Sequence, residues 1–293
     1  MALALQIVQI VAPVFLLAGV GWVWVRLGWD YDIAFVTRLA MSLSLPCLIF
    51  MALVRIEIDI AALRGVALAA LTAYIIIGAL VWAVLRLAGL SMAAFWAPVT
   101  FGNTGNLGLP VAYFAFGQAG LDIAVLIFAV AIFLSFSFGI WAVSGGSSFS
   151  VAFKEPLFWG TALGTLFLAA GWSVPDWIGK SLDLTGQIAI PLMLITLGVA
   201  MSRLQPRALG QALWLCPVKL AICASVSLAV GLWFDLPPMA LGVLMLQVST
   251  PVAVTSYLLA AKFDARADEV AGLVTISTIM SAAAIPVLLA FFV

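Results

Sequence analysis

Ten runs of mainly apolar residues follow one another along the chain. A helix needs about 20 such residues to cross the hydrocarbon core of a bilayer. Of the 293 residues, 66% are hydrophobic and only 8% are charged, whereas soluble domains carry about 25% charged residues. We therefore predict an all-α integral membrane protein with ten transmembrane helices. The runs are Leu3–Val25, Ile33–Val54, Leu63–Leu85, Ala93–Phe116, Ile123–Val143, Leu157–Trp172, Leu182–Met201, Ala212–Phe234, Pro238–Ala261 and Glu269–Val293.

Composition excludes several classes of function. The 12 Lys and Arg residues balance the 12 Asp and Glu residues, so no basic surface indicates a nucleic-acid partner. The chain has no histidine, which removes histidine metal ligands and the Ser–His and Cys–His catalytic pairs. Cys47, Cys216 and Cys223 lie in apolar runs, where small buried thiols are expected rather than disulfides. We expect no metal, no cofactor and no enzymatic activity.

The two halves of the chain place their prolines alike. Pro46 and Pro191, in the second and seventh runs, are separated by nearly half the chain, as are Pro110 and Pro251, in the fourth and ninth. Because five runs per half is an odd number, the second half would insert upside down, as in many secondary transporters. Proline is common in membrane helices, so a chance match also stays open. The predicted parts are a first inverted repeat at residues 1–143, a central cytoplasmic loop at 144–156 and a second inverted repeat at 157–293.

The fourth run is interrupted by a polar, glycine-rich segment, Phe101–Pro110. Its three glycines allow close backbone approach, and Pro110 lacks an N–H donor. The helix should split near Asn103–Leu109, so that its second half presents a helix N-terminus at mid-membrane. Such an end carries a partial positive charge and attracts anions. Asn103 and Asn106 add amide groups, which are unfavourable in hydrocarbon unless they bind something.

The ninth run contains a second break, around Pro251. Non-helical backbone inside a bilayer requires protein or a water-filled cavity around it, and two breaks in corresponding positions point to a transporter's binding site. A pair of proline kinks capped by Ser and Thr is the structural alternative. The candidate substrate-binding residues are Asn103, Thr104, Gly105, Asn106, Gly108, Pro110, Gln247, Ser249, Thr250, Pro251 and Thr255.

The charged residues bear on coupling. All 12 acidic residues fall in predicted loops or at helix ends, so we expect no carboxylate-based cation coupling where the broken helices meet. A uniporter, or a Na⁺ site made of carbonyls and hydroxyls, stays open. Lys219 is the one cation well inside a predicted run. It either attracts or balances an anion, or extends its charge to the membrane interface.

The Lys and Arg residues of the connecting segments and helix ends predict the orientation, because basic residues collect on the cytoplasmic side. One side would carry Arg26, Arg38, Arg86, Lys154, Arg203, Arg207, Lys262 and Arg266, and the other Arg55, Arg64 and Lys180. This predicts a multi-pass protein of the bacterial inner (plasma) membrane with both termini on the outer, periplasmic side.

Several motifs resemble those of the auxin efflux carrier family, which includes the plant PIN proteins and many bacterial transporters. They are Asn-Thr-Gly-x-x-Gly-Leu-Pro at Asn103–Pro110, Ser-Leu-Pro at Ser44–Pro46, Thr-Pro-Val-Ala at Thr250–Ala253, and the final run with Val274–Thr278 and Pro286. The resemblance implies a fold similar to sodium/proton antiporters and bile-acid symporters. It also implies a homodimer, a scaffold of helices 1, 2, 6 and 7, and a mobile transport domain of helices 3–5 and 8–10 with broken crossover helices 4 and 9.

The two helix breaks favour an anion, and the resemblance implies a transporter of small organic anions, such as carboxylates and auxin-like acids, that works by elevator-type alternating access. It works in a lipid bilayer, either as a secondary active or as a facilitative carrier. A Na⁺-coupled bile-acid-type symporter is the main alternative, although its carboxylate ligands are missing. A channel stays open, and an intramembrane enzyme lacks a recognisable catalytic set.

Overall fold

The computed structural model describes residues 2–55, 60–139, 142, 156–204 and 208–292. These residues form helices and connecting segments, and within them β-pairing is limited to one isolated bridge. The predicted central loop, apart from Pro156, lies outside them. Seven helical segments of the described part are long and apolar enough to cross a membrane, and two shorter apolar helices accompany them. The seven are Ile7–Arg26, Ile33–Arg55, Ala62–Leu87, Thr104–Gly139, Asp176–Arg203, Gly210–Trp233 and Ala267–Leu289; the shorter two are Pro156–Ala170 and Pro238–Val248.

The first half contains α-helices joined by three wide π-helical turns, η1 to η3. Local signals fix some of the helix starts. At the start of α2, the Asp32 side chain accepts a hydrogen bond from the Phe35 N–H at 3.0 Å. At the start of α5, the Ser91 hydroxyl accepts one from the Ala94 N–H at 3.4 Å. The elements are α1 (Ala2–Arg26), α2 (Ile33–Leu39), η1 (Ala40–Ser44), α3 (Leu45–Arg55), α4 (Ile60–Leu87), α5 (Met92–Thr100), η2 (Thr104–Gly108), α6 (Leu109–Leu134) and η3 (Ser135–Gly139).

The second half contains α-helices only, as far as it is described. They are α8 (Pro156–Ala170), α9 (Asp176–Gln187), α10 (Ala189–Arg203), α11 (Gly210–Trp233), α12 (Pro238–Val248), α13 (Val254–Lys262) and α14 (Ala267–Leu289). Prolines stand in the first turn of α8 and α12, where the missing N–H has no helical partner in any case.

The long segment Thr104–Gly139 is two helical stretches rather than one. Gly117 interrupts it with φ of 66° and ψ of −155°, a conformation that side chains with a Cβ rarely adopt. The chain changes direction there, where the sequence separates its fourth and fifth apolar runs. The second stretch begins several residues before the predicted Ile123.

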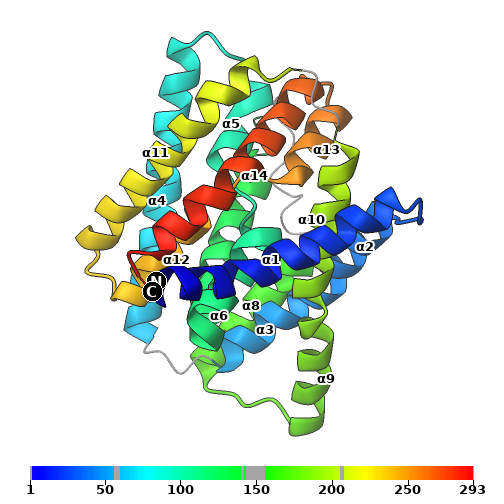
Figure 1. Cartoon of the computed structure of the whole chain (residues 1–293). Helices are drawn as coiled ribbons and strands as arrows, with labels where there is room; N and C mark the ends of the chain where they lie inside the picture. The colour runs from blue at the N-terminus through cyan, green and yellow to red at the C-terminus, as the bar shows by residue number, and fades with distance from the viewer. Residues whose placement is uncertain (1, 56–59, 140–141, 143–155, 205–207, 293) are drawn as a thin grey trace.

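The helices pack in two groups (Figure 1). In the first group, α1 lies along α10, and α3 lies against α8 and α9. Small residues permit these approaches, since a Cβ at Gly198 of α10 would collide with the backbone of Ala18, and one at Gly160 of α8 with that of Pro46. In the second group, α11 packs on α14, α12 and α4, and α6 packs on α12 and α4. Figure 1 shows α4 and α11 on the left and α2, α9 and α10 on the right.

Two helices of the second group are broken. The first break (residues 101–103) separates α5 from η2, and the second break (residues 249–253) separates α12 from α13. The sequence placed the first break near Asn103–Leu109, but residues 104–108 form a π-helical turn that leads into α6. Pro110 stands in the first turn of α6, where it needs no donor. The non-helical part is therefore shorter than predicted and begins earlier.

Candidate functional site

The two breaks meet and satisfy each other's backbone. Gly102 and Val252 form an antiparallel bridge, and the Asn103 N–H donates to the Pro251 carbonyl at 2.6 Å. The Val252 N–H donates to the Ser277 hydroxyl of α14 at 2.9 Å. Polar backbone groups freed by a break are costly to bury without partners. The pairing explains how two non-helical segments lie inside an otherwise apolar, helical structure.

Glycines make this close approach possible. A Cβ at Gly102 would collide with the Thr250 hydroxyl and lie 2.8 Å from the Thr250 carbonyl oxygen. A Cβ at Gly108 would collide with the Gln247 side-chain amide. Thr250 also donates its hydroxyl to the Gln247 carbonyl at 2.7 Å, which caps the end of α12. Gln247 and Thr250 are therefore packing residues of the two breaks.

A cavity of about 280 Å³ lies beside the first break. Both the η2–α6 segment and α13 begin at this cavity, so their first N–H groups and the positive ends of their dipoles lie near it. Its surface combines these ends with apolar and aromatic walls. The lining residues are Thr37, Met41, Ala97, Pro98, Phe101, Gly102, Asn103, Thr104, Gly105, Asn106, Phe128, Ala131, Ile132, Ser135, Phe136, Gly139, Ala253, Thr255, Ser256 and Leu259.

Asn103 is the polar side chain at the centre of this arrangement. It is 4% exposed, and its amide nitrogen has no hydrogen-bond partner among the described residues. Its backbone carbonyl accepts from the N–H groups of Leu107 and Gly108, both at 3.1 Å, which starts the π-helical turn. A buried amide donor without a partner carries a desolvation penalty of about 1–3 kcal/mol. The amide nitrogen is itself buried, so a ligand acceptor in the cavity would remove this penalty once the side chain turns towards it.

The predicted site residues divide into three sets. Those that line the cavity are Asn103, Thr104, Gly105, Asn106 and Thr255. Those that pack the two breaks together or start the next helix are Gly108, Pro110 and Gln247. Those that line a second, much smaller cavity are Lys219, Ser249, Thr250 and Pro251.

Sequence reasoning missed several cavity residues on other helices. Thr37 and Met41 come from α2 and η1, and Ser135 and Phe136 come from η3. Ser135 and Ser137 are a polar pair inside the apolar run Ile123–Val143, which was an available signal. Thr37 carries no such signal, because only the packing of α2 brings it to the cavity.

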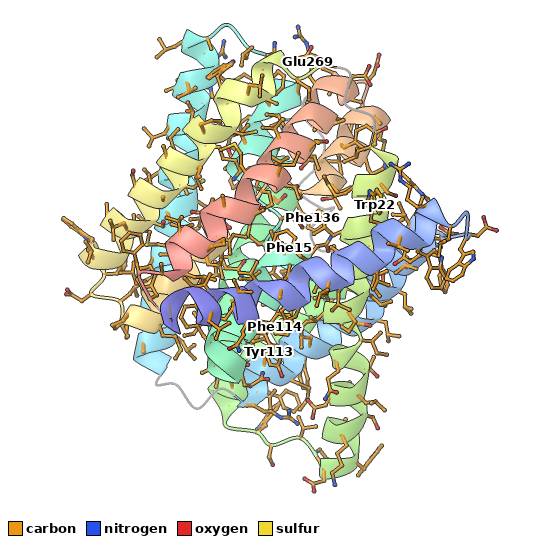
Figure 2. All side chains as sticks on the ribbon, viewed as in Figure 1. Phe15, Trp22, Tyr113, Phe114, Phe136 and Glu269 are labelled. Atoms are coloured by element: carbon orange, nitrogen blue, oxygen red, sulfur yellow. The ribbon has the colours of Figure 1, made fainter. Side chains whose placement is uncertain are left out.

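The cavity is lined by uncharged side chains. Among the described residues, neither acidic nor basic side chains line it. Figure 2 shows Glu269 at the upper edge of the molecule, well away from Phe136, whose side chain lines the cavity. Asp122 is buried, but it accepts a hydrogen bond from Gln118 at 2.8 Å, just beyond the turn at Gly117. The polar groups at the cavity are amides, hydroxyls and helix ends, namely the N-terminal ends of η2 and α13 and the C-terminal end of α5.

An all-helical, highly apolar chain with two paired helix breaks beside a cavity defines a polytopic membrane protein. The family described as "Membrane transport protein" matches residues 6–145 and 140–289, so the chain belongs to this family of auxin efflux carrier-like proteins. The chain is also similar to an uncharacterized transporter of Methanothermobacter thermautotrophicus. The two are 25% identical over 269 residues, which cover 88% of each chain.

Proposed function

We propose that the protein is a secondary transporter, active or facilitative, of small organic anions. The observation that carries the proposal is the cavity at the first break, where two helices begin and the Asn103 amide lacks a partner. Helix N-termini and amide N–H groups bind carboxylates through charge-assisted hydrogen bonds. The residues proposed to contact the anion are Asn103, Thr104, Gly105, Asn106 and Thr255. Ligand pockets for drug-sized molecules measure ~300–1,000 Å³, so a cavity of about 280 Å³ suits a small acid.

The remaining predicted residues support the site indirectly. Gly108, Pro110, Gln247, Ser249, Thr250 and Pro251 shape the two breaks, and we propose that they position the binding residues. A substitution that displaces the binding residues by about 1 Å can lower turnover strongly, even when the substituted residue does not touch the solute. We retain them as part of the transport machinery in this sense.

We propose that the fold is a five-plus-five inverted repeat of ten transmembrane helices. The packing supports this, since α1 with α10 and α3 with α8 are equivalent pairs when the sixth and seventh spans repeat the first and second. Both pairs approach through glycines, Gly198 and Gly160. The N-terminal end of α1 and the C-terminal end of α14 lie next to each other in Figure 1. This fits an even number of spans, which places both termini on one side of the membrane. The two breaks would then be equivalent features of the two repeats.

We propose an elevator mechanism from the position of the cavity between the two helix groups. Thr37 and Met41 belong to the first group, formed by α1–α3 and α8–α10, whereas Asn103 and Thr255 belong to the second. The first group would be the fixed scaffold, and would also form the homodimer that the family resemblance implies. Sliding of the second group past it would expose the cavity to alternate sides. The orientation that fits the positive-inside rule has both termini on the periplasmic side of the inner membrane.

Uptake into proteoliposomes tests the proposed substrate class. The panel is malate, malonate, pyruvate and indole-acetate, each measured beside its neutral amide and beside protein-free liposomes. We expect saturable uptake of at least one acid, exceeding that of its amide by about tenfold or more, since the amide lacks the charge that helix N-termini bind. Equal uptake of an acid and its amide, or no uptake of any acid with proton and sodium gradients applied in turn, would contradict the proposal.

A further inference from the structure

Lys219 is a buried basic residue that lies outside the proposed anion site. It belongs to α11, and its side chain is 3% exposed, so the ammonium group does not reach the surface. It lines a cavity of about 20 Å³ that shares no lining residue with the larger one. The other polar residues of this small cavity are Ser249, Thr250, Ser277 and Ser281.

The ammonium group has no carboxylate partner among the described residues. Its one hydrogen bond there goes to the Cys223 sulfur at 3.8 Å, and sulfur is a weak acceptor. A buried charge is unstable unless oxygen acceptors or an opposite charge compensate it. The walls of the small cavity that Lys219 lines offer the oxygen acceptors that could compensate it, although no hydrogen bond among the described residues joins them to the ammonium group.

Those walls offer oxygen lone pairs rather than hydrogens. The hydroxyl hydrogens of Thr250 and Ser281 are donated to backbone carbonyls, both at 2.7 Å. Ser277 donates to the Val274 carbonyl at 3.3 Å and accepts from the Val252 N–H at 2.9 Å. Oxygens whose hydrogens point elsewhere attract a cation.

Two further features of this place favour positive charge. The hydroxyl of Ser249 is buried, 7% exposed for the residue, and has no hydrogen-bond partner among the described residues. The C-terminal end of α12 lies at the same place, and such an end carries a partial charge of roughly −0.5. The cavity itself has the size of about one water molecule or small ion.

We infer that the Lys219 ammonium is a tethered cation that holds the second break from within. It lines a small cavity whose other walls are hydroxyl oxygens and the carbonyl end of a broken helix, and such carbonyl ends bind Na⁺ in cation-coupled carriers. The chain thus supplies its own cation, and the meeting of the two breaks needs no bound Na⁺. Lys219 is a positioning residue, and the inference holds whichever solute the larger cavity binds.

Thermal unfolding of the purified protein tests this inference without any transported solute. Lys219→Ala removes the charge and leaves room for a small cation, whereas Lys219→Met removes the charge and keeps the stem. Lys180→Met, at an exposed lysine of α9, is the matched control. Each protein is heated in choline chloride, sodium chloride and ethylammonium chloride at one ionic strength.

We expect both Lys219 variants to unfold at least ~5 °C below the wild type in choline, because the hydroxyl oxygens and the carbonyl end of α12 then lose the cation that compensates them. Ethylammonium or Na⁺ should restore at least half of the loss in Lys219→Ala, but little in Lys219→Met. The wild type and Lys180→Met should unfold at the same temperature in all three salts. Unchanged unfolding temperatures for the Lys219 variants, or no salt-specific restoration of Lys219→Ala, would overturn the inference.

If Lys219→Ala gives no folded protein, the unfolding temperatures of the wild type in sodium and choline chloride decide the test. Stabilisation by Na⁺ over choline would show that the place binds a free cation, and would overturn the inference. Equal unfolding temperatures in the two salts would support it. Since neither readout uses a solute, failure here is distinguishable from failure of the carboxylate uptake experiment.

Discussion

The two helix breaks are partners in structure but differ in what their side chains face. The first break ends at Asn103 and is followed by Asn106 in η2, and both residues line the larger cavity. The second break turns Ser249 and Thr250 towards the small cavity of Lys219, and only its final residue, Ala253, and the start of α13 reach the larger one. In the proposed account, the same polar composition inside a membrane has two uses, binding a solute and stabilising the broken backbone. We expect substitutions in the first break to change transport and those in the second to change stability.

The largest expected effect is on packing between the breaks. Gly102→Ala should lower the free energy of unfolding by about 1–3 kcal/mol or more, because the new Cβ collides with the Thr250 hydroxyl and backbone, which cannot move freely. Gly65→Ala is the matched control in α4, where a Cβ would meet no atom within 4 Å. It should stabilise the helix by ~0.5–1 kcal/mol. Thermal unfolding compares the two variants, and equal effects would show that the breaks are not tightly apposed.

The next effect concerns Gln247, which is fully buried with neither amide atom hydrogen-bonded to a described residue. Gln247→Met keeps the size of the side chain and removes the unsatisfied polar atoms. We expect the variant to be more stable by about 1 kcal/mol, since a buried unpaired polar group costs ~1–3 kcal/mol. A fall in the unfolding temperature would mean that the amide is satisfied, and that Gln247 is more than a packing residue.

The smallest expected effects separate two threonines of the same broken helix. Thr255→Val should reduce uptake about three- to tenfold through a lost hydrogen bond in the cavity, with unchanged unfolding. Thr250→Val should lower the free energy of unfolding by ~1 kcal/mol, because its hydroxyl caps α12. Uptake kinetics and thermal unfolding are measured on both. The opposite pattern would reverse the roles assigned to the two cavities.

The sequence predicted the helical class and the two breaks from local properties. Long apolar runs define helices, and the glycines and Pro110 mark the first break. It could not show which polar residue faces which cavity. Gln247 and Thr255 are both polar residues of the ninth apolar run, and only the packing of the helices separates their positions. The π-helical turns η1 to η3 and the approach of Thr37 likewise depend on tertiary contacts. Lys219 was visible as a buried charge, but the hydroxyl oxygens around it come from two other helices.

The central claim is that an anion binds beside Asn103, and a charge placed there tests it most directly. Asn103→Asp keeps the shape of the side chain and repels an anion, Asn103→Ala only removes the amide, and Thr165→Ala on the exposed face of α8 is the control. Uptake of the transported acid should fall ~10–100-fold in Asn103→Ala and further in Asn103→Asp, with Thr165→Ala unchanged. Uptake in a folded Asn103→Asp protein equal to that of the wild type would contradict the account.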